Sequence, residues 1–253
     1  MKQFAIRTAK KAGAYLLENF RKHKNLAEKR GLAKEITTKY DKVSDALIIK
    51  EINKRYPKHN ILTEESGFID KKSEYTWIVD SLDGTTNFSN SNPFFSVSIA
   101  LMKNNELLLG VIYAPFLKEL FVAEKGKGSF LNGKRIHATD TSDIKQSYFL
   151  SCEGGDKTNR RISKINAKIH GRSKDMRKLG AASLEGAWVA CGRAEAYIVT
   201  EISEWDVASA VLLLKEAGGK VTDFKGKEWK AKKSDLIFSN GKIHSKILNT
   251  ISH

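Results

Sequence analysis

The sequence is poor in the features that mark secreted, membrane-spanning and cysteine-ligated metal proteins. Its two cysteines, Cys152 and Cys191, lie far apart without the spacing of metal ligands, so we expect reduced thiols in a cytoplasmic protein. The histidines are dispersed and make no metal pair. No run approaches the ~20 apolar residues that span a bilayer, and residues 1–7 have neither a long apolar segment nor a small-residue cleavage site. We therefore expect neither a membrane span nor a signal peptide.

Internal repeats, low-complexity linkers and a nucleotide fingerprint are also absent. The spacing of Gly126 and Gly128 superficially resembles a phosphate-binding loop, but no helical pattern follows these glycines. The hydrophobic content of 41% excludes a disordered chain, and 253 residues are enough for one large domain or two small ones. The composition thus indicates a globular protein with a sizeable core.

Basic residues outnumber acidic ones, with 44 Lys and Arg against 29 Asp and Glu and a formal charge of +15. This balance favours anionic partners and is compatible with nucleic acid. The lysines are nevertheless scattered through helical patterns, as is typical of solvated helix faces. Charge alone therefore does not favour a nucleic-acid partner.

The first half of the chain has a pattern of two helices followed by a meandering antiparallel sheet. Helices are predicted over 3–21 and over 41–56, the second ending at Pro57. Between them lie a charged segment, 22–34, expected to be a loop, and a short β-like stretch, 35–41. Strands are predicted over 60–63, 77–79, 94–102, 107–113 and 119–124, with a turn between short strands over 129–134.

A second unit begins near Asp143 and alternates strands with helices, as expected for an α/β layer. The predicted order is a strand over 148–151, a basic helix over 156–170, a strand-to-loop step over 176–183, a helix over 183–191, a strand over 194–199 and a helix over 207–217. The last helix is apolar on most sides and must be largely buried. The pair Gly218-Gly219 closes it.

The most informative stretch runs from Trp77 to Phe88 and carries two carboxylates, Asp80 and Asp83, after a buried strand. Gly84 permits a tight turn or a close backbone approach, and Thr85 or Thr86 can cap a following helix whose free N–H groups attract an anion. Because carboxylates alone repel a phosphate, a divalent cation such as Mg²⁺ must lie between them.

Other acids stand at comparable places. Glu64 and Glu65 follow a brief strand, and since neighbours on a strand point to opposite faces, only one of them can point directly into a site. Asp41 and Asp206 each begin a helix, where an N-cap is the ordinary role of an aspartate. Strand ends that carry carboxylates can nevertheless converge at one edge of a sheet, and a cap can also bind a metal.

Together these residues resemble the inositol monophosphatase family of Mg²⁺-dependent, lithium-sensitive phosphatases. The resemblance rests on Glu64-Glu65, the stretch 80–86 and Trp205-Asp206 followed by Glu216-Ala217-Gly218-Gly219, and it spans nearly the whole chain. It implies an α/β (α+β) fold, the layered αβαβα sandwich of sugar phosphatases, in one domain over 1–253. An antiparallel-sheet half, 1–141, and an α/β half, 142–253, would enclose the site, and the protein would be a homodimer.

The resemblance also implies roles for individual residues. One Mg²⁺ would be held by Glu64, Asp80 and the Leu82 carbonyl. A second would be held by Asp80, Asp83 and Asp206. A weaker third site would be formed by Asp41 with Glu64, and Glu65 would support the cluster. Asp41, Glu64 and Thr85 would be catalytic, the Thr85 hydroxyl and Glu64 positioning the attacking water. The expected phosphate and substrate contacts are Asp83, Gly84, Thr85, Thr86, Gly180, Ala181, Ala182 and Asp206.

Three positions depart from the family pattern. Ser81 replaces a proline, and Glu35 stands where an aspartate is usual. Val199 replaces the glutamate that bonds a sugar hydroxyl in inositol-specific members, and Glu201 or Glu204 could substitute for it from a rearranged loop. The expected reaction is hydrolysis of a small polyol or sugar phosphate, of the inositol 1-phosphate or fructose 1,6-bisphosphate type, by direct attack of metal-activated water.

Two alternatives remain open. One is hydrolysis of 3′-phosphoadenosine 5′-phosphate on the same fold. The other is a regulatory protein that binds RNA or RNA polymerase, similar to family members of that kind, and the charge of +15 is its support.

Overall fold

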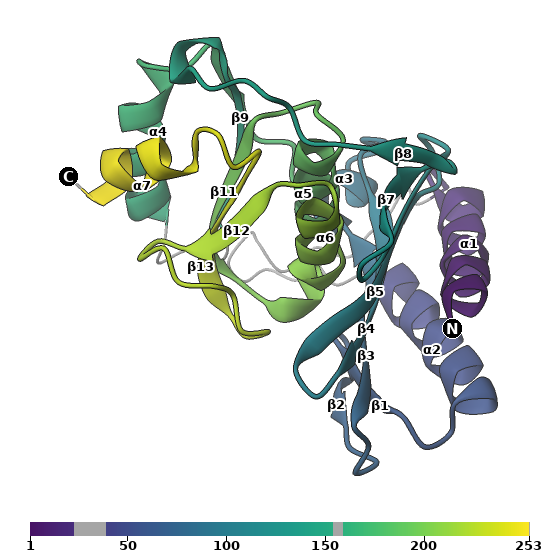
Figure 1. Cartoon of the computed structure of the whole chain (residues 1–253). Helices are drawn as coiled ribbons and strands as arrows, with labels where there is room; N and C mark the ends of the chain where they lie inside the picture. Colours follow the sequence, from purple (N-terminus) through teal and green to yellow (C-terminus); the bar gives the residue numbers. More distant parts are fainter. Residues whose placement is uncertain (23–38, 154–158, 253) are drawn as a thin grey trace.

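The computed structural model describes residues 1–22, 39–153 and 159–252, and they form a five-layer α/β/α/β/α sandwich (Figure 1). An eight-stranded sheet and a five-stranded sheet stand on either side of a central helical layer. Two further pairs of helices cover the outer faces of the sheets. The expected layered α/β fold is therefore confirmed. Among the described residues, no helix combines the length and the apolar character needed to cross a bilayer.

The larger sheet contains the strands of the first half in the order β2-β1-β3-β4-β5-β6-β7-β8. Its strands are β1 (Asn60–Thr63), β2 (Gly67–Ile69), β3 (Tyr75–Asp83), β4 (Ser96–Lys103), β5 (Glu106–Ala114), β6 (Glu119–Glu124), β7 (Gly128–Leu131) and β8 (Lys134–Ile136). All neighbours are antiparallel except β1 and β3, which are parallel. Asn104 and Asn105 both have positive φ, as a two-residue hairpin between β4 and β5 requires. The predicted meander is confirmed.

The first-half helices are α1 (Lys2–Asn19), α2 (Lys39–Arg55) and the short α3 (Thr85–Ser89). Helices α1 and α2 cover the outer face of the larger sheet (Figure 1). The β-like stretch predicted up to Asp41 is wrong for 39–41, because these residues form the first turn of α2. Residues 23–38, which include most of the predicted loop and Glu35, lie outside the described residues.

The smaller sheet has the order β10-β9-β11-β13-β12. Its elements and the helices around it are η1 (Ile144–Gln146), β9 (Tyr148–Glu153), α4 (Asn159–His170), β10 (Asp175–Arg177), α5 (Ala182–Ala190), β11 (Ala196–Ile202), α6 (Glu204–Glu216), β12 (Lys220–Asp223), β13 (Ser234–Ser239) and α7 (His244–Ser252). Strand β9 is parallel to β10 and β11, whereas β13 is antiparallel to its neighbours. The sequence patterns predicted no elements after 219 and missed β12, β13 and α7.

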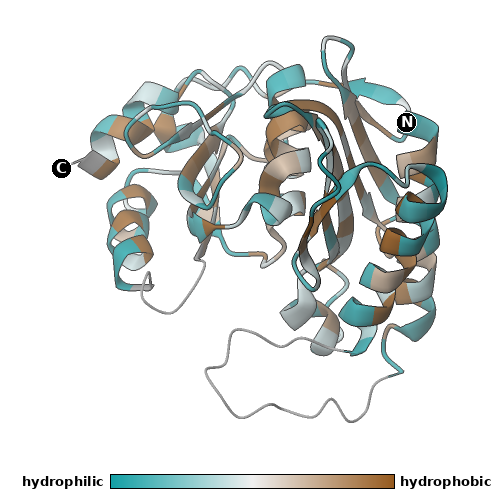
Figure 2. Cartoon of the chain, turned by 90° about the horizontal axis from the view of Figure 1, so that it is seen from below, coloured by the Kyte–Doolittle hydropathy of each residue, from teal (hydrophilic) through white to brown (hydrophobic). Residues whose placement is uncertain are grey.

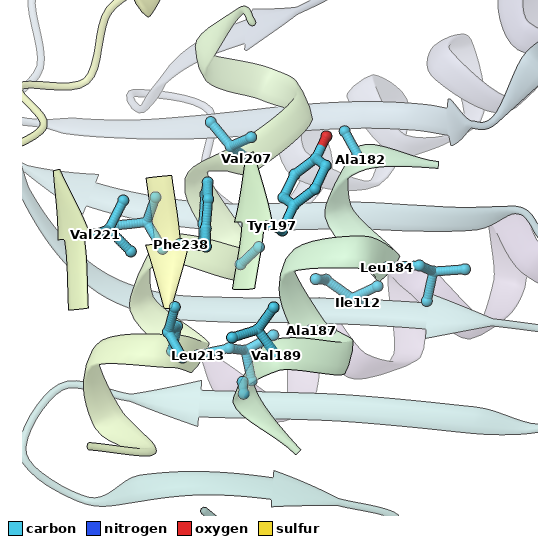
Figure 3. Packing of buried hydrophobic residues seen from close by; sticks show 14 of the residues in the cluster. Ile112, Ala182, Leu184, Ala187, Val189, Tyr197, Val207, Leu213, Val221 and Phe238 are labelled. Carbon is cyan, nitrogen blue, oxygen red and sulfur yellow. The ribbon is translucent and has the colours of Figure 1, made fainter. Parts of the chain in front are cut away.

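The central layer consists of α5 and α6, whose apolar residues pack against both sheets. Figure 3 shows this core, in which Ile112 of β5, Leu213 of α6 and Phe238 of β13 have no exposed surface. A Cβ at Gly110 of β5 would lie 2.8 Å from the Ser209 carbonyl oxygen, so only glycine lets α6 approach this closely. Hydrophilic residues lie on the outer surfaces (Figure 2).

Candidate metal centre and active site

Three carboxylates from distant parts of the chain meet in one cluster. One oxygen each from Glu64, Asp80 and Asp206 lies within 4.8 Å of the other two. The parallel pairing of β1 with β3 sets Thr63 beside Val79, so the residues that follow them, Glu64 just after β1 and Asp80 within β3, lie close together. Asp206 enters from the first turn of α6.

The electrostatics of this cluster are those of a cation site. Burial, followed by repulsion from Glu64, Asp83 and Asp206, raises the pKa of Asp80 well above its ordinary value. Removal from solvent and repulsion from Glu64 and Asp83 raise the pKa of Asp206 in the same way. Within the described residues, neither Asp80 nor Asp206 forms an ion pair with a basic side chain. Oxygen donors that repel one another in this way fit a hard divalent cation such as Mg²⁺.

Each of these two aspartates also accepts a backbone hydrogen bond. The Leu82 N–H donates to Asp80 Oδ1 (3.0 Å), and the Ser203 N–H donates to Asp206 Oδ2 (3.0 Å). The N-cap of α6 is Ser203, so the N-cap role expected for Asp206 is wrong. Asp206 is the third residue of the helix, closes a capping box with Ser203 and lies in the cluster as well. A carboxylate has two oxygens and about four lone pairs, so the two roles are compatible.

Asp83 lies beside the cluster, but its carboxylate faces the N-terminus of α5. Its Oδ1 accepts the Ala182 N–H (2.8 Å), and its Oδ2 accepts the Ser183 N–H (3.0 Å) and hydroxyl (2.5 Å). Burial raises the pKa of Asp83, and the Ser183 and Ser96 hydroxyls oppose that rise. A register irregularity between Asp80 and Asp83, where β3 pairs with β4, aims the two carboxylates differently. Asp83 thus ties the motif strand to the central helical layer.

The turn after Asp83 is built around Gly84, which is the N-cap of α3 with φ 88°. A Cβ there would lie 3.0 Å from the Phe94 carbonyl oxygen and 3.1 Å from the Ala181 Cβ. The prediction that Thr85 or Thr86 caps this helix is wrong, because the cap is Gly84 and has no side chain to bond. The exposed Thr86 is one residue further along α3.

The Thr85 hydroxyl points instead to Asp41 and to the Leu82 carbonyl. It lies 2.8 Å from Asp41 Oδ1 and 3.0 Å from the Leu82 carbonyl oxygen. Asp41 is 4% exposed in the first turn of α2. Ser81, which replaces a proline, donates its hydroxyl to the Asp41 carbonyl (3.1 Å). Hydrogen bonding thus holds the motif against α2 although the proline ring is missing.

The loop that carries the expected substrate residues lies directly against the motif. Gly180 has φ 81°, and its carbonyl oxygen would be 3.3 Å from a Cβ on Gly84. The Asn87 side-chain amide lies 2.7 Å from the Leu179 carbonyl and 3.2 Å from that of Gly180. Ala181 and Ala182 are buried where α5 begins. The two groups of expected phosphate and substrate residues are therefore adjacent.

Three polar residues near the site were missed by the sequence patterns. Asn87 gave no signal beyond its place in the motif. Glu185 was detectable as an acid in an otherwise apolar helix, and it has no exposed surface. Asp45, one turn after Asp41, is 2% exposed and accepts the Ser66 hydroxyl (2.6 Å), which holds the turn after Glu64. The pKa of Asp45 is raised by burial.

The other predicted site residues lie around the cluster or in the core beside it. Glu65 is half-buried, and burial, followed by repulsion from Asp41 and Asp45, raises its pKa. Val199 has no exposed surface and belongs to the hydrophobic core. The Glu201 backbone N–H donates to Asp235 of β13 (2.9 Å), and the Glu201 carboxylate lies 4.0 Å from the Lys233 ammonium. Glu204 lies close enough to Asp206 to raise the pKa of that acid. Of the two substitutes for the missing glutamate, Glu204 is the one beside the cluster.

A five-layer sandwich with a carboxylate cluster between its halves is the architecture of the metal-dependent sugar phosphatases. The chain belongs to the inositol monophosphatase family, whose model matches residues 1–253, and it is a phosphatase.

Curated relatives and solved structures agree with this assignment. The fructose-1,6-bisphosphatase/inositol-1-monophosphatase of Thermotoga maritima is 36% identical over 98% of this chain and 94% of its own length. The inositol monophosphatase of Dictyostelium discoideum is also 36% identical, over 97% and 92%. The Nus factor SuhB of Pseudomonas aeruginosa is 34% identical over 99% and 95%.

Among solved structures, the Thermotoga maritima IMPase superposes with a TM-score of 0.90 at 36% identity, covering 99% of this chain and 96% of that one. The extragenic suppressor protein suhB of Bartonella henselae superposes with a TM-score of 0.93 at 32% identity, covering 98% and 97%.

Proposed function

We propose that this phosphatase is a Mg²⁺-dependent phosphomonoesterase that hydrolyses a small polyol or sugar phosphate by direct attack of water. The observation that carries the proposal is the convergence of Glu64, Asp80 and Asp206 within 4.8 Å. Relatives named inositol monophosphatase and fructose-1,6-bisphosphatase/inositol-1-monophosphatase support the substrate class.

The metal ligands would be Glu64, Asp80 and Asp206, together with the Leu82 carbonyl and Asp83. Bound Mg²⁺, two or three ions as the resemblance implies, would neutralise the phosphate, lower the pKa of the attacking water and stabilise the leaving oxygen. Asp83 Oδ1 accepts one hydrogen bond and keeps a further lone pair for such a role. Asp83 would also keep α5, and with it the substrate loop, in register with the motif.

Thr85 is placed to handle the water. Its single hydroxyl proton is directed to Asp41 or to Leu82, so the lone pairs of the oxygen stay available to accept a hydrogen bond from the attacking water. Glu64 would accept the second bond and so align the water for in-line attack. The N–H groups of Gly84 and Thr85 would bind the phosphate oxygens.

The polyol side of the site would be formed by Gly180, Ala181 and Ala182. The buried Val199 offers no polar atom to a sugar hydroxyl, and the half-buried Glu204 is the acid best placed to do so. We therefore expect a broader tolerance for polyol and sugar phosphates than an inositol-specific enzyme has.

The test is phosphate release from myo-inositol 1-phosphate, fructose 1,6-bisphosphate and 3′-phosphoadenosine 5′-phosphate, each with Mg²⁺ and with or without Li⁺. Asp80→Asn should lower the rate at least 100-fold, whereas the matched change Asp70→Asn, at an exposed acid after β2, should leave it unchanged. Failure of the wild-type protein to release phosphate from every ester, or full activity in Asp80→Asn, would overturn the proposal. Preference for the nucleotide would replace the substrate class only.

A second candidate is a regulatory binding role on the same fold, which the relatives named Nus factor SuhB favour. Such a role needs no metal ligand. It would therefore survive Asp80→Asn, which removes the hydrolytic activity.

A further inference from the structure

A hollow on the smaller-sheet half of the molecule is rich in cations, which make up seven of its thirteen lining residues. It has a volume of about 720 Å³ and lies between α4 and the segment 224–233 that joins β12 to β13. We call it the basic groove, and six cations that line it are Arg161, Lys164, Lys168, Lys225, Lys227 and Lys232. None of them belongs to the acid cluster.

The charges of the groove are poorly neutralised. Among the described residues, two acids line it: Asp235 binds Arg161 (2.6 Å), and Asp223 Oδ1 accepts the Lys225 and Lys227 backbone N–H groups (2.8 Å each). The remaining lining cation, Lys233, lies 4.0 Å from Glu201. Within the described parts of the chain, the five lysines named above have no carboxylate at ion-pair distance. Five like charges around one hollow repel one another and attract an anion.

Three of these cations form a row along α4. Arg161, Lys164 and Lys168 are exposed on one face of α4 at spacings of three and four residues, while Ile162, Ile165 and Ile169 on the adjacent face are buried in the core, Ile165 at the wall of the groove. At 1.5 Å per residue the row is about 10 Å long. A row of that length can contact more than one phosphate of a nucleic-acid strand. The lysines of 224–233 line the hollow with this row.

The groove also contains an aromatic surface. Phe224 is half-buried, and the Arg161 guanidinium lies over its ring at 5.1 Å. Cations that follow a phosphate backbone beside an aromatic ring are the combination by which proteins bind single strands. A single phosphate ester would engage only a few of these cations, whereas a strand that carries several phosphates can engage most of them.

We propose that the basic groove binds the phosphate backbone of a single-stranded nucleic acid, at a site separate from the phosphatase centre. The net charge of +15 attracts a nucleic acid at long range. The groove binds its phosphates at short range, and substitutions inside and outside the groove can distinguish the two effects.

The test is fluorescence anisotropy of the Mg²⁺-loaded protein with a labelled 15-residue oligouridylate that has no terminal phosphate, so that the catalytic centre has no monoester to bind. With five neutralised phosphates, a slope of about −0.7 per contact predicts roughly 100-fold weaker binding at 200 mM than at 50 mM salt. The variant Lys225→Gln/Lys227→Gln/Lys232→Gln should bind at least 10-fold more weakly at 50 mM salt and show a shallower salt dependence.

The matched control is Lys10→Gln/Lys50→Gln/Lys58→Gln, which removes the same charge from exposed positions around α1 and α2. It should bind like the wild-type protein, and both variants should keep wild-type phosphatase activity and circular dichroism. Equal weakening in the control would overturn the proposal, because attraction would then follow net charge alone. So would the absence of binding at 50 mM salt, or groove-dependent binding to phosphatidylserine vesicles without binding to the oligonucleotide.

Discussion

Glu185 is a buried acid whose protonation should control the stability of the central layer. It has no exposed surface in α5, and its Oε1 accepts the Leu179 N–H (3.0 Å), which anchors the loop before Gly180. Its Oε2 has no hydrogen-bond partner among the described residues. Burial raises the pKa of Glu185 from 4.5 to about 8, and the Leu179 N–H opposes only part of that rise. The carboxyl is therefore neutral in the folded protein at pH 7.

The consequence for stability follows from the two pKa values. In the unfolded chain Glu185 ionises near pH 4.5, whereas in the folded chain it stays protonated up to about pH 8. The stabilisation by this group is complete below pH 4.5 and is lost progressively as the pH rises to about 8. At about 1.4 kcal/mol per pH unit, the loss between pH 5 and pH 8 is about 4 kcal/mol.

The perturbation that isolates this effect is Glu185→Gln, which keeps the shape and the acceptor for Leu179 but cannot ionise. Urea unfolding of both proteins from pH 5 to pH 8 should show the variant gaining about 4 kcal/mol relative to the wild-type protein. The buried acids that do not interact with Glu185 titrate alike in both proteins and cancel from the difference, whereas the repulsion between Asp83 and Glu185 is part of the effect measured. A difference that stays constant over this range would refute the reasoning, because Glu185 would then be ionised normally in the folded state.

A second variant separates the anchoring of the loop from the charge. Glu185→Leu removes the acceptor of the Leu179 N–H, so it should raise KM for the phosphate ester more than Glu185→Gln does. Equal KM values in the two variants would show that the hydrogen bond does not position the substrate loop.

Three further predictions concern packing and the metal centre. Gly110→Ala should destabilise the protein by about 2–3 kcal/mol in urea unfolding, because the added Cβ would meet the backbone of Ser209. The control Gly171→Ala, where an added Cβ would have nothing within 4 Å, should leave the stability unchanged. Equal effects of the two substitutions would contradict the close approach of α6. Tyr197→Phe should cost less than about 1 kcal/mol, since the buried Tyr197 hydroxyl (Figure 3) has no partner among the described residues, and a loss above about 2 kcal/mol would reveal a bound water. Without metal, the raised pKa of Asp80 makes the free energy of unfolding fall as the pH rises, so Mg²⁺ should raise the Tm more at pH 8 than at pH 5.5. Asp80→Asn should abolish this increase of the Tm by Mg²⁺. An increase as large as in the wild-type protein would show that Asp80 does not bind the metal.

Local patterns in the amino-acid sequence were sufficient to predict most elements of the fold. Alternation and turn residues predicted the antiparallel meander, and β6 begins and ends where the pattern placed it, at Glu119 and Glu124. Helical spacing predicted α1 and α2, and the apolar run of α6 predicted its burial. These features depend on neighbours within a few residues, so the chain reveals them without any knowledge of its folding partners. The residue types in the stretch 77–88 also indicated a metal and phosphate site.

Tertiary contacts determine which acids face one another and what each carboxylate binds. Glu64 meets Asp80 because β1 pairs in parallel with β3, and both meet Asp206 because α6 packs across the sheet more than 100 residues later. The turn of Asp83 toward α5 depends on an irregularity in β3 and on distant N–H groups. The burial of Val199 depends on the central layer. Such contacts join segments far apart in the chain, and no local pattern records them.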